Sequence, residues 1–200
     1  MAEHAADPGR RRFLTATTAV VGGAGVVWAA VPFFTAFKPS ARAVAAGVAV
    51  EVDISKLAEG AQVIKKWRKR PVFVVRRTPA LLAALEGQKG RLKDPESSNI
   101  EQQPGYIEKQ FRSLKPEVLV LVGSCTHLGC SPKFHPEMQP TAWDSEWQGG
   151  YYCPCHNSRF DMAGRVYEGS PAPSNLVVPP YHYKDENTIV IGEDPQQGAA

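Results

Sequence analysis

The four cysteines of this 200-residue chain lie in two short runs, and each run also contains one histidine. The runs are Cys125-Thr126-His127-Leu128-Gly129-Cys130 and Cys153-Pro154-Cys155-His156. Two thiolates and two imidazoles suit either a tetrahedral zinc ion or a two-iron cluster in which histidines hold one iron. The remaining pair, Cys130 and Cys155, has matching positions in the two runs and can form a disulfide. Two such loops joined by a disulfide are typical of a cluster site and point to electron transfer.

A long apolar segment near the N-terminus is the second informative feature. Residues 16–37 carry no charge, and 22 residues in a helix span roughly 33 Å, enough to cross the hydrocarbon core of a bilayer. The segment is preceded by Arg10-Arg11-Arg12-Phe13-Leu14, which resembles the twin-arginine export signal. The alternative is an ordinary basic flank of a membrane helix. We favour the export signal because Phe13 and Leu14 fall at the expected offsets.

The apolar segment is expected to stay in the membrane as an anchor. A cleaved signal peptide needs small residues after a short apolar core, and residues 41–46 offer such a site. The segment is nevertheless long enough to span, and its phenylalanines at 33, 34 and 37 suit an interfacial position. We therefore expect a single-pass protein of a bacterial inner membrane, with residues 1–15 cytoplasmic, residues 16–37 spanning, and the rest in the periplasm, where disulfides form.

Residues 38–47 are predicted to form a flexible neck. Most of them are small, and ten extended residues reach at most about 33–36 Å. Such a segment keeps the domain at residues 48–200 near the membrane while allowing it to swing.

The charge distribution argues against nucleic-acid binding. The chain has 23 basic and 20 acidic residues, of which five basic and two acidic ones lie within residues 1–42. The main domain then holds 18 of each and has no net charge. It has no overall electrostatic attraction for nucleic acid. A local basic stretch at residues 65–77 is predicted to be the solvated face of a hairpin.

The pattern after the neck predicts a β fold. Glycine and proline number 17 each, which favours a loop-rich β domain. One short helix is predicted at residues 80–86, with Thr78 as its cap and Pro79 at its first position, and a second at 106–113. Many short strands separated by turns predict an antiparallel β-sandwich. The predicted strands are residues 48–54, 62–68, 72–77, 118–122, 151–152, 166–167, 175–178 and 188–191.

The paired Cys/His runs closely resemble the two boxes of Rieske iron–sulfur proteins, in the disulfide-bearing form found in quinol-oxidising cytochrome bc complexes. The order of anchor, small-residue neck and β domain is also similar. Ser170-Pro171-Ala172-Pro173, followed by residues 175–181, resembles the proline loop that covers the cluster in that family. The likeness covers essentially the whole chain. It implies a mainly β Rieske domain, an antiparallel β-sandwich with a cluster-binding subdomain inserted at about residues 120–182.

The resemblance also implies roles for individual residues. It implies one [2Fe–2S] cluster, with one iron held by cysteines and the other by histidines. Ser158 is implied to donate a hydrogen bond to a cluster sulfide. Histidine ligation raises the potential of such clusters to roughly −150 to +300 mV, which suits oxidation of a quinol. The implied ligands are Cys125 and Cys153 for one iron and His127 and His156 for the other, and the implied disulfide joins Cys130 and Cys155.

The function implied by this family is electron transfer in the respiratory chain. The subunit would take one electron from ubiquinol bound at cytochrome b, with His156 binding the quinol hydroxyl and accepting its proton. It would then pass the electron to cytochrome c1 and contribute to proton translocation, without holding a complete active site alone. Three alternatives remain open on the residues. They are the Rieske subunit of another exported oxidase such as arsenite oxidase, a Rieske ferredoxin or oxygenase, and a zinc-stabilised binding domain.

Three further residues near the boxes are expected to affect the cluster, the turn or the docking face. Phe160 stands where many respiratory members have tyrosine, so it cannot donate a hydroxyl bond to a cysteine sulfur. Asn157 stands where glycine is common, which predicts a left-handed conformation that asparagine tolerates. Leu128 is expected to cap the loops as part of a docking face, with ordinary packing as the alternative. The aromatic residues Trp143, Trp147, Tyr151 and Tyr152 are expected to pack in the core or at its rim.

Overall fold

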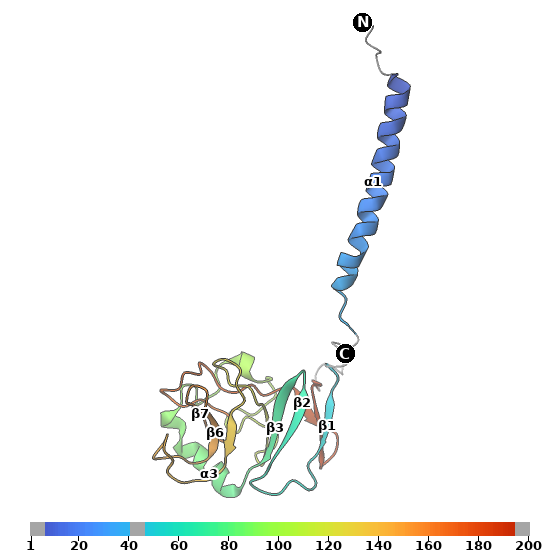
Figure 1. The fold of residues 1–200 in the computed structure, drawn as a ribbon. Coiled ribbons are helices and arrows are strands. Elements are labelled where there is room, and N and C mark those ends of the chain that lie inside the picture. Colours follow the sequence, from blue (N-terminus) through green and yellow to red (C-terminus); the bar gives the residue numbers. More distant parts are fainter. Residues whose placement is uncertain (1–6, 41–46, 195–200) are drawn as a thin grey trace. The chain divides into compact units, whose positions relative to one another are not determined.

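The structure is a computed structural model that describes residues 7–40 and 47–194. The chain divides into two compact units, Met1–Ala45 and Ala46–Ala200. The first unit contains the helix α1 (Pro8–Ala36), in which no residue is buried (Figure 1). Its cap is the side chain of Asp7, which accepts a hydrogen bond from the Gly9 amide. The helix is long and apolar enough to cross a membrane. It begins at Pro8, before the predicted span at residues 16–37, and proline is favoured at the first position of a helix.

The first sheet of the second unit joins the two ends of that unit. It contains β1 (Val50–Asp53), β9 (Thr188–Ile191) and β8 (Tyr181–Tyr183), in that order and all antiparallel. Val50 lies opposite Ile191 in this register. The start of the domain is therefore fixed to its end by a backbone ladder.

The second sheet is a meander of β2 (Gln62–Trp67), β3 (Arg70–Arg76) and β4 (Val118–Val122). The hairpin turn is Arg68-Lys69, and both residues have positive φ, 48° and 64°. Positive φ at both residues is the conformation of a two-residue hairpin turn whose twist matches the twist of the flanking strands. β4 is buried along its whole length, which explains its continuous run of apolar residues.

Helix α3 (Pro79–Gly87) follows β3 and confirms the predicted capping. The Thr78 hydroxyl oxygen accepts a hydrogen bond from the Leu81 amide at 3.2 Å, and proline occupies the start of the helix. Two single-turn 3₁₀ helices, η1 (Lys89–Arg91) and η2 (Ile100–Gln102), lie in the polar loop that follows.

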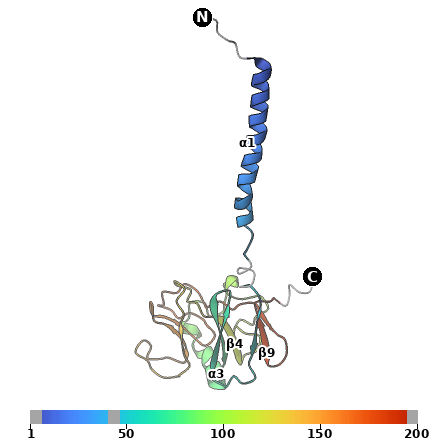
Figure 2. The same cartoon turned by 45° about the vertical axis from the view of Figure 1, so that its right-hand side comes forward.

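The third sheet is inserted in the sequence between β4 and β8. It contains β5 (Lys133–His135), β6 (Gly150–Cys153) and β7 (Ser158–Phe160), again antiparallel. In Figure 1, β6 and β7 lie on the side of β3 that is away from β1, and Figure 2 shows β4 within the domain and β9 at one side of it. The predicted architecture is confirmed as mainly antiparallel β sheet with one N-terminal apolar helix. The β strands are arranged as three small sheets.

The predicted helix at residues 106–113 is wrong. The chain there makes turns, with an isolated bridge between Glu108 and Ser113. Arg112 has a φ of 52°, a left-handed conformation that a right-handed helix cannot contain. The guanidinium of Arg112 is fully buried and makes hydrogen bonds to several carbonyl groups. The hydrogen bonds of the buried Arg112 therefore hold this segment, and helical backbone bonds do not.

Two predicted strands, at residues 166–167 and 175–178, are also wrong. The first makes only isolated bridges within the described chain. The second is an extended loop whose hydrogen bonds go to three separate segments, so no single neighbour supplies a ladder. The bonds are Leu176 N–H to Gly164 O, Val122 N–H to Val177 O and Val178 N–H to Gln102 O, each 2.8 Å.

A stacked pair of rings connects the second and third sheets. Phe73 on β3 and Tyr151 on β6 have centroids 5.4 Å apart and nearly parallel planes, at 7°. Gly123, directly after β4, lies against the Phe73 ring so closely that a Cβ there would come within 2.3 Å of it. The backbone that enters the first Cys/His run therefore rests on this ring.

We predict that Gly123→Ala destabilises the domain by about 1–3 kcal/mol, because an added methyl must displace the Phe73 ring from a packed core. The measurement is thermal or urea unfolding of the purified chain in detergent. Gly105→Ala is the matched control, since a Cβ at Gly105 meets no atom within 4 Å. Equal unfolding midpoints for the two variants would contradict this account.

Candidate metal centre

The first Cys/His run forms a closed loop after β4. The Cys125 amide donates to the Cys130 carbonyl at 2.7 Å, and the Gly129 amide donates to the Cys125 carbonyl at 2.9 Å. Gly129 has a φ of 84°, a conformation that favours glycine. These bonds bring the first and last residues of the run together and leave His127 and Leu128 at its outer end.

The second run is the turn between β6 and β7. Cys153 and Ser158 lie opposite each other in the ladder, so residues 154–157 close a tight turn. Asn157 has a φ of 59°, which confirms the left-handed conformation predicted for it. The turn presents His156 to solvent, while Cys153 stays in the core.

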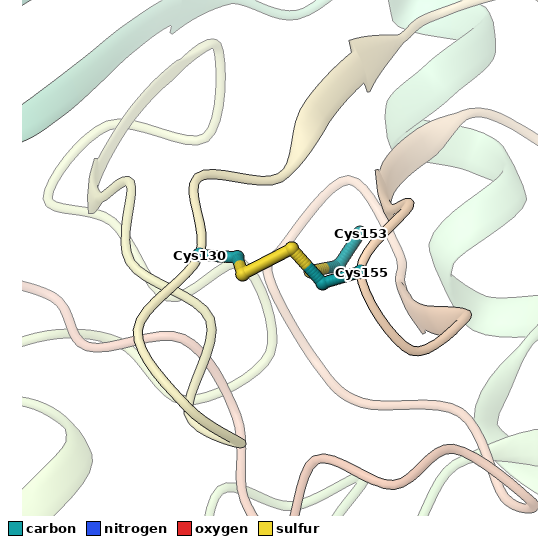
Figure 3. Close-up of side chains that lie close together, drawn as sticks. All are labelled: Cys130, Cys153 and Cys155. Atoms are coloured by element: carbon teal, nitrogen blue, oxygen red, sulfur yellow. A yellow bond between two sulfur atoms is a disulfide. The ribbon is translucent and has the colours of Figure 1, made fainter.

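A disulfide between Cys130 and Cys155 joins the two runs (Figure 3). The predicted pairing is therefore confirmed. The sulfur atoms of Cys130, Cys153 and Cys155 lie within 4.8 Å of one another. Two of these sulfurs are bonded to each other and offer no thiolate, so Cys153 is the one member of this group that can bind a metal.

Apart from the disulfide, the two runs hold two free thiols and two imidazoles. Cys125 and Cys153 are free and only 3% and 1% exposed. The rings of His127 and His156 lie edge to face with centroids 4.6 Å apart. The Nδ1 atom of His127 is buried and has no hydrogen-bond partner among the described residues. A buried ring nitrogen that has no hydrogen-bond partner is suited to metal ligation. The two thiols and two imidazoles therefore fit a cluster with two sulfur and two nitrogen ligands.

The environment of Cys153 favours its protonated thiol, unless a nearby positive charge stabilises the thiolate. Burial raises its pKa, while hydrogen bonds from the backbone N–H groups of Cys155 and His156 oppose that rise. Bound iron favours the thiolate, because metal coordination deprotonates a cysteine. The two N–H groups then face a charged sulfur and become stronger hydrogen-bond donors.

The loop at residues 170–174, which resembles a proline loop, is hydrogen-bonded to the first run and to Ser158, the residue of β7 that follows the turn of the second run. The Thr126 hydroxyl donates to the Ser174 carbonyl at 2.6 Å. The Ser158 hydroxyl oxygen accepts from the Ala172 amide at 3.1 Å, and Ser158 is fully buried. The hydroxyl hydrogen of Ser158 remains available for a donor role.

Residues that the sequence did not single out hold this loop and the segment that follows it in place. The Lys93 ammonium donates to the carbonyls of Ser170 and Ala172 at 2.7 and 3.0 Å. The guanidinium of Arg112 donates to the Leu176 carbonyl at 2.7 Å. Lys93 and Arg112 lie in irregular, polar segments with no motif or periodicity, so their role depends on long-range contacts that no local signal reports.

The other residues near the boxes divide into an exposed and a buried set. Leu128 is 72% exposed, so ordinary packing within this chain is not its role. Phe160 is fully buried and pairs with Tyr151 across β6 and β7. Ser158 pairs with Cys153 in the same ladder, so residues 158 and 160 lie on the same face of the third sheet as Tyr151 and Cys153. The expected packing of the aromatic residues is confirmed, since Trp147 and Tyr151 are buried.

Two family models match this chain. The first, described as Ubiquitinol-cytochrome C reductase Fe-S subunit TAT signal, matches residues 1–40. The second, described as Rieske [2Fe-2S] domain, matches residues 52–182. The twin-arginine prediction is confirmed by the first match. The second covers the whole site described above, so the chain is a Rieske protein with a [2Fe–2S] cluster.

Curated relatives match the chain over nearly its full length. The ubiquinol-cytochrome c reductase iron-sulfur subunit of Allochromatium vinosum is 54% identical over 185 residues, which cover 92% of this chain and 89% of the relative. The subunit of the same name from Blastochloris viridis is 42% identical over 188 residues, 94% of each chain. A solved chain titled Hyperthermophilic respiratory Complex III covers 89% of this chain and 98% of its own length, at 23% identity and a TM-score of 0.46. The curated relatives show that the chain belongs to the iron–sulfur subunits of ubiquinol–cytochrome c reductase, an oxidoreductase.

This family assignment decides between the open alternatives. A zinc-stabilised domain does not explain the match of residues 52–182 to the family model of Rieske [2Fe–2S] domains. A ferredoxin or another exported oxidase does not account for a curated relative that is 54% identical and covers the anchor, the neck and the domain together. The chain is therefore one subunit of the respiratory reductase complex.

We predict that the double variant Cys130→Ser, Cys155→Ser lowers the free energy of unfolding by roughly 3–4 kcal/mol. The disulfide closes a sequence separation of 25 residues, and the chain-entropy model gives about this value for such a loop. The measurement is thermal unfolding with and without a thiol reductant. Reductant should lower the midpoint of the unsubstituted chain and leave that of the double variant unchanged. A double variant as stable as the unsubstituted oxidised chain would contradict the prediction.

Proposed function

We propose that Cys125 and Cys153 ligate one iron of the cluster and His127 and His156 the other. The observations that carry this proposal are that the two free thiols are buried, that the rings of His127 and His156 are in contact, and that the disulfide removes the other two cysteines from ligation. When bound, the cluster supplies a one-electron acceptor whose potential is raised by histidine ligation. The protein supplies the rigid loops, the buried thiols and an exposed histidine edge.

His156 is the proposed contact with ubiquinol. It is exposed, whereas His127 is partly covered, so the His156 ring is the more accessible partner for a quinol hydroxyl. We infer that its outward nitrogen accepts the hydrogen bond and then the proton of ubiquinol bound at cytochrome b. The exposed Leu128, which directly follows His127, offers an apolar contact for the same docking surface. The subunit then delivers the electron to cytochrome c1.

The proposed topology has α1 as a retained anchor and the Rieske domain in the periplasm. The twin-arginine segment supports export, and the disulfide requires an oxidising compartment. The neck at residues 38–47 is proposed to let the domain move between cytochrome b and cytochrome c1. Residues 41–46 of that neck, which also contain the small residues of a cleavage site, lie outside the described residues.

The ligand assignment is tested by single substitutions in the full chain. Cys125→Ala, His127→Ala, Cys153→Ala and His156→Ala should each abolish the electron spin resonance signal of the reduced cluster, because each removes a metal ligand. His182→Ala is the matched control. His182 lies on β8, outside both Cys/His runs, so its removal should leave the signal intact. An unaltered signal in any of the four ligand variants would refute the assignment of that residue.

The residues at 158 and 160 are proposed to set the cluster potential. A hydroxyl that donates to a cluster sulfur stabilises the more negative, reduced state, because charge-assisted hydrogen bonds strengthen as charge grows. Ser158 has such a hydroxyl, and Phe160 lacks one. The potential of this protein is therefore expected at the lower end of the range for its class.

We predict that Phe160→Tyr raises the midpoint potential and that Ser158→Ala lowers it. One hydrogen bond of about 1–1.5 kcal/mol corresponds to roughly 45–65 mV for one electron. Redox titration of the purified chain measures both shifts. A potential that falls in Phe160→Tyr, or that stays unchanged in both variants, would show that these residues do not tune the cluster.

A further inference from the structure

The turn that carries His156 has a side-chain contact outside the two Cys/His runs. The Tyr152 hydroxyl donates a hydrogen bond to Oδ1 of Asn157 at 2.6 Å. Tyr152 directly precedes Cys153, and Asn157 directly follows His156, so the contact closes the turn from its two ends. We propose that Tyr152 and Asn157 are positioning residues that hold the turn at residues 153–157 in the shape needed at Cys153 and His156.

The backbone conformation makes this contact important for the turn. Asn157 has a φ of 59°, in a region that non-glycine residues enter rarely. Asparagine adopts it at low cost because its short amide forms local hydrogen bonds. Here that amide bonds to Tyr152, so the side chain that tolerates the left-handed conformation also fixes it.

An aromatic ring supports the ring of Tyr152. Trp143 stacks on it with a centroid distance of 4.2 Å and an interplanar angle of 16°. The Trp143 carbonyl accepts a hydrogen bond from Arg159 at 3.1 Å. The same four residues, Trp143, Tyr152, Asn157 and Arg159, line one surface hollow. The stack restricts the Tyr152 ring, which reduces the entropy lost when its hydroxyl bonds to Asn157.

A buried ion pair anchors this support. Arg159 lies 3.3 Å from the Asp144 carboxylate, and Arg91 makes two bonds of 2.7 Å to the same group. The side chain of Asp144 is only 3% exposed. A buried carboxylate held by two guanidinium groups is a rigid arrangement. The loop that contains Trp143 is therefore fixed to the third sheet.

The shape of the turn matters to the metal centre through two backbone donors. The N–H groups of Cys155 and His156 bond to the Cys153 sulfur. Hydrogen bonds to a ligand sulfur stabilise the reduced cluster more than the oxidised one. A turn released from Tyr152 aligns these donors less well, so the midpoint potential should fall. This step rests on the proposed ligation by Cys153.

The test uses the full chain with its cluster and two variants that remove the contact in different ways. Tyr152→Phe removes the donor and keeps the ring that stacks on Trp143. Asn157→Gly removes the acceptor and keeps a residue that favours the left-handed conformation. Each should retain the cluster signal and shift the reduction equilibrium about threefold toward the oxidised state, which is roughly 30 mV when about 59 mV is tenfold. The double variant should shift it no further than either single variant, because both lose one bond.

Tyr167→Phe is the matched control for loss of a tyrosine hydroxyl. The Tyr167 hydroxyl bonds to the Gln88 side chain at 3.1 Å, away from the turn, so its loss should lower the unfolding midpoint and leave the potential unchanged. Unchanged potentials in both Tyr152→Phe and Asn157→Gly, or additive shifts in the double variant, would overturn the proposal. A cluster signal retained in Cys153→Ala would instead overturn the proposed ligand set.

Hydrogen exchange provides a second measurement for any variant that does not retain its cluster. Backbone amides of residues 155–158 in the cluster-free chain should exchange faster in Tyr152→Phe and Asn157→Gly than in Tyr167→Phe. Equal exchange rates in the three variants would overturn the positioning role. A difference confined to the first two variants would support it without reference to the metal.

Discussion

The Cys130–Cys155 disulfide is the constraint on which the metal centre depends. It joins the loop between β4 and β5 to the turn between β6 and β7, and no strand ladder pairs these two segments directly in the described part of the chain. Without a covalent link, two exposed loops would gain conformational entropy by separating. The link allows the loops to remain at the surface, where a redox partner can reach them, and each loop carries one free thiol and one imidazole. The ring stack of Phe73 on Tyr151 supplies the base on which both loops rest.

Buried guanidinium groups stabilise the irregular segments around that base. Arg77, Arg112 and Arg165 are all at most 1% exposed. Arg165 pairs with Asp161 at 2.7 Å, whereas Arg112 bonds mainly to backbone carbonyls of separate loops. Burial lowers the pKa of both Arg77 and Arg112 to about 10, so each stays charged at neutral pH. A charged donor with several carbonyl acceptors holds loops together where no β ladder can, which is why the proline-containing loop stays ordered without being a strand.

The sequence was sufficient for those features that depend on local chemistry. Residue type and spacing predict the apolar run of α1, the Thr78 cap and the strands at β4 and β9. The left-handed Asn157 was predicted from the family resemblance, because glycine is common at that position. The three-residue strands β5, β7 and β8 were not predicted, because such short segments carry too little alternation. The false helix at residues 106–113 has a similar cause, since the signal that excludes it is the burial of Arg112 among distant carbonyls. Lys93 and the Tyr152–Asn157 contact could not be predicted either, because each depends on segments that meet only in the folded domain.

The distribution of buried and exposed residues across the site indicates which side of it can contact a redox partner. The two free thiols are enclosed, so the sulfur atoms are shielded from water. His156 and Leu128 are exposed, so a partner meets an imidazole edge and an apolar side chain first. A site that exchanges electrons must approach its partner closely, yet a cluster exposed on all sides would be open to hydrolysis and oxidation. Here the enclosed sulfur side packs on the core and the histidine side faces outward, and the disulfide lets one small domain satisfy both requirements.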